Sequence, residues 1–317
     1  MTTDVIPLGT ASALPTKTRH LSALAVERKG RLLLFDCGEG TQYRLLDADL
    51  SHARIDAIFV THLHGDHCYG LPGLLSSMAL QQRTEPMTLV APTGIRAMLE
   101  AIPGAAPSEL PFPVEIREIG EELTEALVYE TSEVTVTARP LEHREFAMGF
   151  RLEERTRPGR FDPETARALG VPEGPAFARL QSGESVTVED GTTVQPDQVL
   201  GPPRPGISVA YVTDTRPCDG GRALAQDVDL LYHDATFTDA LYDRAVETGH
   251  STAREAAEVA QEAGASRLLL GHISARYDDS TPLETEAQAV FLRASVAEEL
   301  RRYVLDPREK ESDSFRT

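Results

Sequence analysis

Three histidines and one aspartate fall within residues 62–67, whose sequence is HLHGDH. The first two histidines are two positions apart, so they share a face if the apolar strand pattern before them continues. A tight turn at Gly65 would then carry the aspartate and the third histidine towards a second ion. Neutral imidazole and carboxylate are suitable zinc ligands, and burying this many polar side chains without a metal would leave several unsatisfied. The segment therefore predicts a metal site.

Further candidate ligands follow other apolar stretches of the chain. One metal site takes three or four protein ligands, so two sites need more residues than this segment supplies. His143, Asp214 and His272 each end or closely follow an apolar strand pattern, where a loop can project the side chain into a shared cleft. The candidate ligands are therefore His62, His64, Asp66, His67, His143, Asp214 and His272.

The elements that must position these side chains are typical of an α/β protein. Short apolar stretches punctuated by glycine predict strands, and a capping box at Thr252 and Glu255 predicts the start of a helix. Two runs of strands with helices on both sides indicate an α/β sandwich. The expected strands are residues 5–8, 21–26, 32–35, 57–60, 88–91, 133–140, 207–212, 230–233 and 268–270. The expected helices are residues 71–82, 252–263 and 283–303, with a polar tail after them.

Residues 154–201 differ from the rest of the chain. Glycine and proline recur there and long apolar runs disappear, which indicates an insertion or arm. Its central part, residues 155–182, holds five arginines against three acidic residues, a charge of +2 within a chain of net charge −19. A mobile, solvated loop without a special role is the alternative interpretation. We expect a single domain spanning residues 1–317 with this arm inserted.

The charge balance bears on the kind of substrate. Acidic residues number 50 against 31 basic ones, and only three of the latter are lysines. Net repulsion of this size opposes binding to a polyanion at low salt. Either the partner is not a nucleic acid, or the protein works in concentrated salt, where screening lengths fall to a few ångströms. We favour the second explanation because the candidate site suits a phosphodiester.

Composition also bounds the class of protein. With 317 residues, 41% of them hydrophobic, the chain can bury a sizeable core. Three cysteines without a CxxC pair argue against a disulfide framework. No apolar run approaches the length of about 20 residues that spans a bilayer, and the first residues show no signal-peptide pattern. We expect a cytoplasmic protein without membrane contact.

The order HLHGDH, then a single histidine, aspartate and histidine, resembles the metallo-β-lactamase superfamily. That resemblance implies a four-layer αββα sandwich that holds two zinc ions per subunit, with Mn²⁺ or another divalent ion left open. The implied ligands of the first zinc are His62, His64 and His143; those of the second are Asp66, His67 and His272, and Asp214 bridges both. The superfamily motif leaves the substrate open, because one fold serves many reactions.

Four further segments are similar to the ribonuclease Z family: residues 7–16, residues 35–42, residues 233–237 with 249–253, and the Gly/Pro arm. The resemblance implies an endoribonuclease that removes the 3′ trailer from precursor tRNA and leaves a tRNA 3′-hydroxyl and a trailer 5′-phosphate. It further implies a homodimer in which one subunit's arm holds the tRNA that the other cuts. The resemblance gives Asp66 the role of proton acceptor, and it implies that His250 assists the leaving oxygen or stabilises the phosphorane-like state. Asp234 departs from the family, which more often has glutamate there.

Other interpretations stay open. The chain could be a small-molecule phosphodiesterase or esterase of the same fold, or a non-catalytic RNA-binding relative. His250 could make a structural hydrogen bond only, and Arg216 could contact phosphate or form a salt bridge. Glu39 could support the site or cap a helix from residue 41. We interpret His20, His52 and His233 as structural or surface residues.

Overall fold

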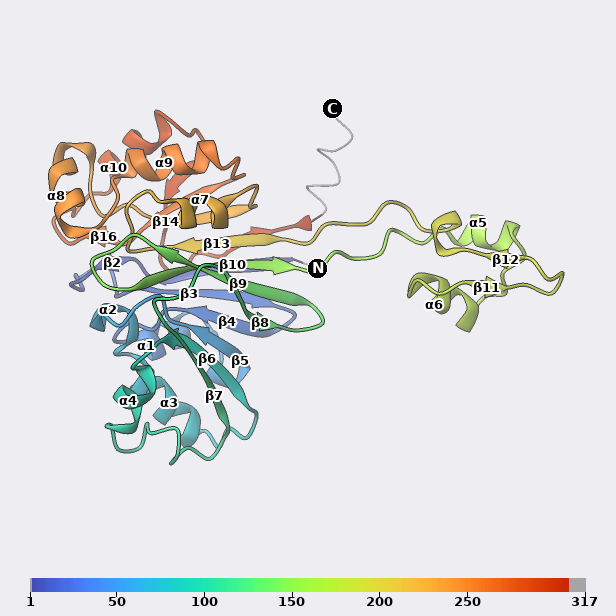
Figure 1. Ribbon diagram of the computed structural model, residues 1–317, viewed down its shortest axis with the longest axis horizontal. Helices are drawn as coiled ribbons and strands as arrows, with labels where there is room; N and C mark the ends of the chain where they lie inside the picture. Colours follow the sequence, from blue (N-terminus) through green and yellow to red (C-terminus); the bar gives the residue numbers. More distant parts are fainter. Residues whose placement is uncertain (1, 308–317) are drawn as a thin grey trace. The chain divides into compact units, whose positions relative to one another are not determined.

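The computed structural model describes residues 2–307, which form two compact units. The larger unit combines residues 2–153 with Ile207–Leu305, and the smaller contains Glu154–Gly206. In the larger unit two sheets pack face to face, with helices on the outer face of each (Figure 1). Each sheet buries one face against the other and one under helices, so this is the α/β sandwich that the pattern of elements predicts, in the four-layer αββα form that the superfamily resemblance implies.

The first sheet is parallel on the side that leads to the HLHGDH segment. β4 to β7 run parallel, so their carboxyl ends lie at one edge. β5 is buried along most of its length, and its carboxyl end leads directly into the histidine segment. In spatial order the strands are β18 (Tyr303–Leu305), β1 (Thr3–Gly9), β3 (Ala23–Arg28), β4 (Arg31–Phe35), β5 (Ile55–Phe59), β6 (Met87–Pro92) and β7 (Val114–Ile119).

The second sheet also contains both parallel and antiparallel pairs of strands. β13, β14, β15 and β17 are parallel, whereas β10 pairs antiparallel with β13. In spatial order the strands are β17 (Ala294–Val296), β15 (Leu268–Gly271), β14 (Leu230–Asp234), β13 (Ser208–Val212), β10 (Ala147–Glu154), β9 (Val134–Leu141) and β8 (Ala126–Glu130). A separate two-stranded sheet pairs β2 (Ala11–Ser12) in parallel with β16 (Ile273–Ser274), and so joins the first half of the chain to the second.

Aromatic side chains fill the space between the two sheets. Phe35 and Phe59 from the first sheet stack at 5.0 Å between ring centroids, and Phe150 and Tyr211 from the second pack against Phe35. Burial of each such ring stabilises the fold by roughly 2 kcal/mol. The contacts hold the two sheets in a fixed position relative to each other, which the site requires since its residues come from both.

Helices cover the outer face of each sheet. α9 shows why: its capping box is formed as predicted, and alanines on one face pack closely against the second sheet. None of the helices within residues 2–307 is long and apolar enough to cross a membrane. Over the first sheet lie α1 (Thr41–Asp47), α2 (Gly65–Cys68), α3 (Leu71–Leu80) and α4 (Ile95–Glu100). Over the second lie α7 (Asp219–Ala225), α8 (Tyr242–Thr248), α9 (Ala253–Glu262) and α10 (Thr281–Gln288).

The helix expected over residues 283–303 is wrong in its second half. α10 ends at Gln288, and two short strands follow. Ala294 pairs with Leu268 in β15, and Tyr303 pairs with Val5 in β1. Each sheet has an edge strand with unpaired backbone groups there, so pairing prevails over local helix propensity. Most of the polar tail, from residue 308 onward, lies outside the described residues.

The smaller unit has structure of its own. It contains α5 (Pro163–Ala168), α6 (Pro175–Gln181), β11 (Val186–Thr187) and β12 (Thr193–Val194), and Asp162 caps α5 by accepting from two backbone N–H groups. Short apolar side chains form a separate core in it: Ala166, Val171, Leu180, Val186, Val188, Val194 and Val199. The unit ends at Gly206, five residues beyond the expected end of the arm. It is a small folded body and not a bare loop.

Candidate metal centre

The structure brings the seven predicted ligands together where strands from both sheets end. Residues 62–64 follow β5, and α2 carries the next two ligands back towards the same place. His143 follows β9, Asp214 follows β13, and His272 follows β15. Each ligand therefore sits on a short segment whose direction is set by a buried strand, so the packing of the sandwich fixes the site.

The first group of ligands is His62, His64, His143 and Asp214, with one donor atom from each lying within 4.8 Å of all the others. His62 Nε2 is 2.9 Å from His64 Nδ1 and 3.5 Å from Asp214 Oδ2. His143 Nε2 is buried and has no hydrogen-bond partner among the described residues. A buried nitrogen left in this way requires an explanation, and a cation among these four donors supplies one. The residues present fit a metal ion.

The second group is Asp66, His67 and His272, again within 4.8 Å. His67 Nε2 lies 3.3 Å from Asp66 Oδ2, and His272 Nε2 lies 3.5 Å from the same oxygen. Asp214 faces both groups: its Oδ1 is 3.3 Å from His67 Nε2 and 3.1 Å from His272 Nε2, and its Oδ2 points at His62. One carboxylate oxygen is therefore available to each of two ions.

The remaining ring nitrogens of the histidines have partners of their own. A metal-ligating imidazole normally uses its second nitrogen for a hydrogen bond that fixes the ring. That arrangement is present four times: His62 with Thr61 Oγ1 at 3.0 Å, His67 with Asp36 Oδ2 at 2.7 Å, His143 with Gly249 O at 2.9 Å, and His272 with Thr236 Oγ1 at 3.1 Å. In each case Nδ1 makes the bond, which leaves Nε2 directed into the centre.

Burial and the neighbouring carboxylates set the charge of each side chain in the centre. Burial alone would lower the pKa of His67, but the carboxylates of Asp214 and Asp36 raise it well above the usual value, so a bound cation would have to displace that proton. Burial lowers the pKa of His62 and of His143, so both are neutral and can donate a lone pair. Burial alone would raise the pKa of Asp66, but hydrogen bonds from the imidazoles of His272 and His67 hold it well below the usual range. The pKa of Asp214 is likewise depressed, against the effect of burial, by the neighbouring imidazoles. The carboxylates are ionised.

Asp36 supports the site, and the sequence analysis gave it no role. It is fully buried, and it accepts hydrogen bonds from Thr61 N at 2.8 Å and Tyr211 OH at 3.0 Å besides its contact with His67. The available signal was an acidic residue directly after the buried strand β4.

Asp36, Asp214 and His272 also share a left-handed backbone, with φ of 58°, 55° and 56°.

Asp234 and His250 form a pair beside the ligands. His250 Nδ1 lies 2.8 Å from Asp234 Oδ2, and Asp234 also accepts from Thr215 N and from Thr236 N and Oγ1. Burial opposes protonation, but the Asp234 carboxylate raises the pKa of His250 to about 9. The oxygens of Asp234 are within reach of His272 as well. Because hydrogen bonds already occupy them, we assign Asp234 to orienting His250.

The other residues singled out in the sequence have structural contacts. Arg216 binds Glu255 and the backbone oxygen of His250, which favours its salt-bridge interpretation. The helix after Glu39 begins at Gly40 without a side-chain cap hydrogen bond, so Glu39 does not cap it. None of His20, His52 and His233 belongs to a candidate ligand group in the described part of the chain.

A cavity of about 330 Å³ opens over the ligands. His250 lines it together with His64, Asp66, His143, Asp214 and His272, and Ser12, Ala13, Arg144, Glu145 and Thr248 complete its wall. A second hollow of about 400 Å³ shares His64 and Glu145 with the first. Its wall is partly apolar, through Leu63, Ile119 and Phe146. The accessible space therefore extends beyond the ligands on the side of His64.

Comparisons with known proteins identify relatives over the whole chain. The family model of the β-lactamase superfamily domain matches residues 199–273, and that of the anti-Pycsar protein Apyc1 matches residues 3–103. A ribonuclease Z from Salinibacter ruber is 73% identical over 99% of this chain and 98% of its own length. One from Halorubrum lacusprofundi is 48% identical over 92% and 93%. The crystal structure of human tRNase Z, short form, superposes with a TM-score of 0.69 at 29% identity, covering 95% of this chain and 98% of that one.

Proposed function

This chain belongs to the ribonuclease Z family, and on that premise we propose that it is a metal-dependent endoribonuclease that removes the 3′ trailer from precursor tRNA. The products would be a tRNA with a 3′-hydroxyl and a trailer with a 5′-phosphate. The observation that carries the proposal is the convergence of all seven candidate ligands, with Asp214 facing both groups. A non-catalytic RNA-binding relative would have no use for a complete ligand set.

We propose two zinc ions as the cofactor. His62, His64 and His143 would hold the first, Asp66, His67 and His272 the second, and Asp214 would contact both. When bound, the pair of ions supplies charge that polarises the phosphodiester and makes a water molecule acidic enough to react near neutral pH. Mn²⁺ accepts similar imidazole and carboxylate ligands, so the choice of ion is part of the test below.

Residues of the chain itself would handle the protons. Asp66 lines the cavity, and the ribonuclease Z resemblance gives it the role of accepting the proton of the attacking water. Its position is fixed by Ala13, whose backbone N–H donates to Asp66 Oδ2 at 2.9 Å. His250 lines the same cavity and would donate a proton to the leaving oxygen. Asp234 holds the ring of His250 through Nδ1.

We propose that the smaller unit, Glu154–Gly206, is the arm that binds the substrate away from the cleaved bond. The unit has its own core, and although its six arginines and eight acidic residues give residues 154–206 a net charge of −2, the part from residue 155 to 182 carries +2. The fold supports a role in which a surface is presented to a large partner. A compact second unit would not serve a small-molecule substrate, which needs no second contact site.

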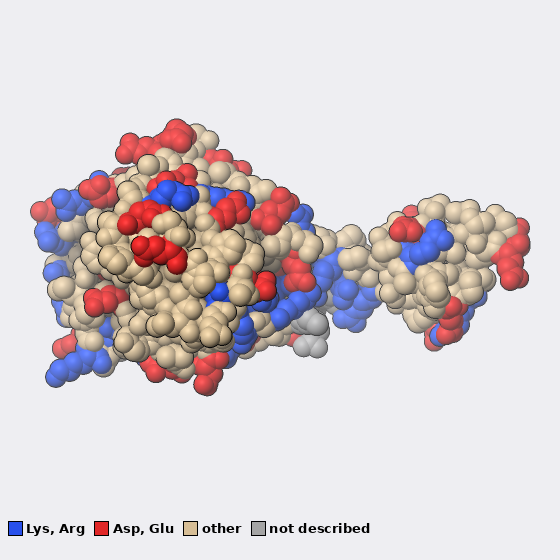
Figure 2. Space-filling view, turned by 90° about the horizontal axis from the view of Figure 1, so that it is seen from below, with Lys and Arg blue, Asp and Glu red and all other residues tan. Residues whose placement is uncertain are grey.

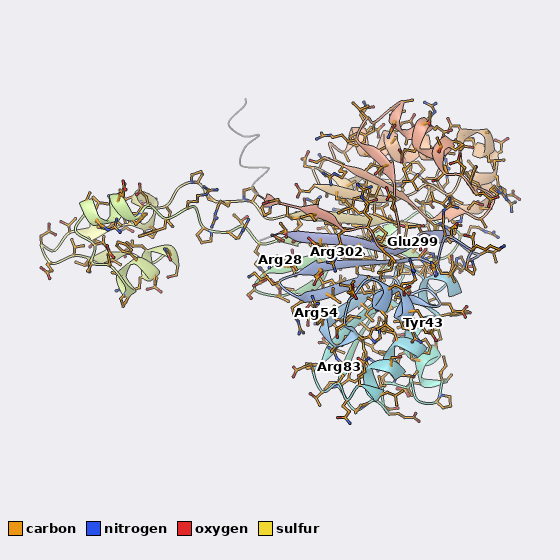
Figure 3. The ribbon with its side chains drawn as sticks, turned by 180° about the vertical axis from the view of Figure 1, so that it is seen from behind. Arg28, Tyr43, Arg54, Arg83, Glu299 and Arg302 are labelled. Carbon is orange, nitrogen blue, oxygen red and sulfur yellow. The ribbon has the colours of Figure 1, made fainter. Side chains whose placement is uncertain are left out.

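We further propose that the chain works as a homodimer. α1 exposes Tyr43, labelled in Figure 3, and Leu46, with 64% and 57% of their surfaces accessible. These two side chains are three positions apart and so lie on one face of the helix. Apolar side chains grouped in this way commonly mark contact surfaces between proteins. A second copy of this chain is the partner that the ribonuclease Z resemblance implies.

The acidic side chains do not form a single continuous field on the face that Figure 2 shows. On the face shown in Figure 2, acidic side chains lie in separate groups with uncharged surface between them. Screening by salt weakens interactions between exposed charges that are further apart than the Debye length. We therefore propose that the enzyme binds RNA best in concentrated salt. A cytoplasmic location stays a prediction from the sequence.

A direct experiment tests the proposal. The purified chain is incubated with a 3′-extended precursor tRNA and with bis(p-nitrophenyl) phosphate, in Zn²⁺ or Mn²⁺, at low and at molar KCl. We expect a single cut at the 3′ side of the tRNA body, with a 5′-phosphate on the trailer, and no cut after chelation of the metal. Cleavage of the small ester alone would identify a small-molecule phosphodiesterase. Binding of RNA without cleavage of either substrate would identify a non-catalytic relative.

A further inference from the structure

The segment after β17 is tied at two points to chain segments that lead to the second group of ligands. Ala297 N donates to Leu270 O at 2.9 Å, two residues before the ligand His272. Leu300 N donates to Pro7 O at 2.8 Å, shortly before the loop of residues 10–20. Glu299 lies between these two anchor points and is labelled in Figure 3. Its backbone position is therefore fixed relative to the loop and to the strand that carries His272.

The carboxylate of Glu299 closes the loop of residues 10–20 at its base. Oε1 accepts from Thr10 N at 3.1 Å, Thr10 Oγ1 at 3.2 Å and His20 N at 2.7 Å. Oε2 lies 2.8 Å from His20 Nδ1 and accepts from Arg44 Nη2 at 3.1 Å. The Glu299 side chain is only 9% exposed. One nearly buried carboxylate thus holds both ends of the loop, through hydrogen bonds of the stronger, charge-assisted kind.

The same loop contacts the second group of ligands at two points. At its tip, Ala13 N donates to Asp66 Oδ2, with Ala13 in a left-handed conformation at φ 59°. At its base, β2 pairs with β16, and Thr10 O accepts from Ile273 N at 2.7 Å. Ile273 directly follows His272. A displacement of the loop would therefore move Asp66 and His272 together.

We propose that Glu299 is a positioning residue for the metal position formed by Asp66, His67 and His272. Glu299 is not a ligand in either group; it acts through Thr10 and Ala13, which touch the ligand segments. The other position, of His62, His64 and His143, makes no hydrogen bond with this loop among those found in residues 2–307. The inference rests on the proposed two-metal centre and not on the RNA substrate.

The test is a metal titration of Glu299→Gln. The amide keeps one acceptor oxygen but removes the charge, and it places an N–H₂ group where His20 and Arg44 now donate. The metal-free variant is titrated with zinc against a chromophoric chelator. We expect one of the two binding steps to weaken about tenfold, the lower end of what lost outer contacts cost a metal site, while the other is unchanged. Glu298→Gln, at a neighbouring side chain that is 65% exposed, is the matched control and should bind as the unmodified chain does.

Each outcome decides between alternatives. If Glu299→Gln lowers the melting temperature but leaves both zinc steps unchanged, Glu299 is a structural residue only and the proposal is overturned. If the unmodified chain fails to bind two zinc ions, the proposed function fails, whatever Glu299 does. Should Glu299→Gln not fold, His20→Ala removes a single contact of the same carboxylate. His20→Ala should weaken the same zinc-binding step by a smaller factor. If both zinc-binding steps are unchanged in His20→Ala, the proposal is equally overturned.

Discussion

The carboxylate of Asp36 lies 2.7 Å from Nδ1 of His67, although 31 positions separate these residues in the chain. Both side chains are completely buried. The same carboxylate accepts a hydrogen bond from Tyr211, which belongs to the second sheet. Asp36 therefore connects the packing between the sheets to the orientation of one ligand ring.

We expect Asp36→Asn to weaken zinc binding by about 10- to 100-fold, because the ring of His67 loses the charged acceptor that fixes it. A zinc titration of the metal-free variant measures this. The control is Asp56→Asn, which removes an ion pair with Arg31 at the surface. Exposed pairs of that kind contribute at most about 1 kcal/mol to stability. Zinc affinity that is unchanged in Asp36→Asn would show that His67 is held by packing alone.

His250→Ala should separate the two substrates. We expect cleavage of precursor tRNA to slow by about 100-fold or more, since the leaving 3′-oxygen needs a proton. Bis(p-nitrophenyl) phosphate releases p-nitrophenolate, a weak base that leaves without one, so its hydrolysis should change by less than about tenfold. Steady-state rates on both substrates provide the comparison. Equal losses of rate on the two substrates would show instead that His250 acts through the metal ions and not on the leaving oxygen.

Removal of the arm is expected to spare the chemistry. Glu153 pairs with Ser208 across β10 and β13, so Glu154 can be joined to Ile207 by an Asn-Gly turn in place of residues 155–206. The shortened chain should hydrolyse bis(p-nitrophenyl) phosphate at a normal rate, while its kcat/KM for precursor tRNA falls by about 100-fold or more, a loss of roughly 3 kcal/mol.

The boundaries of that deletion matter. A cut limited to residues 155–182 would remove Ala166, Val171 and Leu180 and leave the other half of the arm's core exposed. Loss of activity in such a variant would reflect misfolding. With the complete arm removed, a parallel loss on both substrates would show that the arm supports the metal centre and not the tRNA.

Salt should stabilise the fold. At a net charge of −19 the excess acidic side chains repel one another at low ionic strength, and this repulsion falls as the screening length shortens. Between about 0.1 M and about 2 M KCl we expect the melting temperature to rise by roughly 5 °C. An uncharged osmolyte at equal osmolality is the control, since solutes can also stabilise by exclusion from the surface. A melting temperature independent of KCl would contradict the prediction.

The convergence of the candidate ligands could be predicted because imidazole and carboxylate groups are rare at such short spacing. The composition of residues 62–67 alone indicates a metal site, and the three distant candidates follow strands that the apolar pattern also predicts. Asp36 gives no comparable signal, since its partner His67 is remote and its neighbours are apolar. Glu299 gives no sequence signal either, because its five hydrogen-bond contacts come from residues 10, 20 and 44, which are remote in the sequence.

Elements that depend on remote partners were missed for the same reason. Residues 294–296 and 303–305 are strands only because β15 and β1 offer free edges beside them. The core of the arm is built from five valines, one leucine and one alanine spread over residues 166–199, with no periodic run that would predict it. The apolar pattern of a segment predicts the structure of that segment alone, whereas these strands and this core depend on contacts with residues that are remote in the sequence.

The left-handed backbone at Asp36, Asp214 and His272 bears on how the candidate ligands are positioned. Each such residue costs on the order of 1 kcal/mol, so it persists only where its surroundings impose it. The three residues follow the buried strands β4, β13 and β15, so the ends of these strands are the surroundings in question. A core substitution that shifts one of these strand ends would therefore disturb the centre from a distance, without touching any candidate ligand.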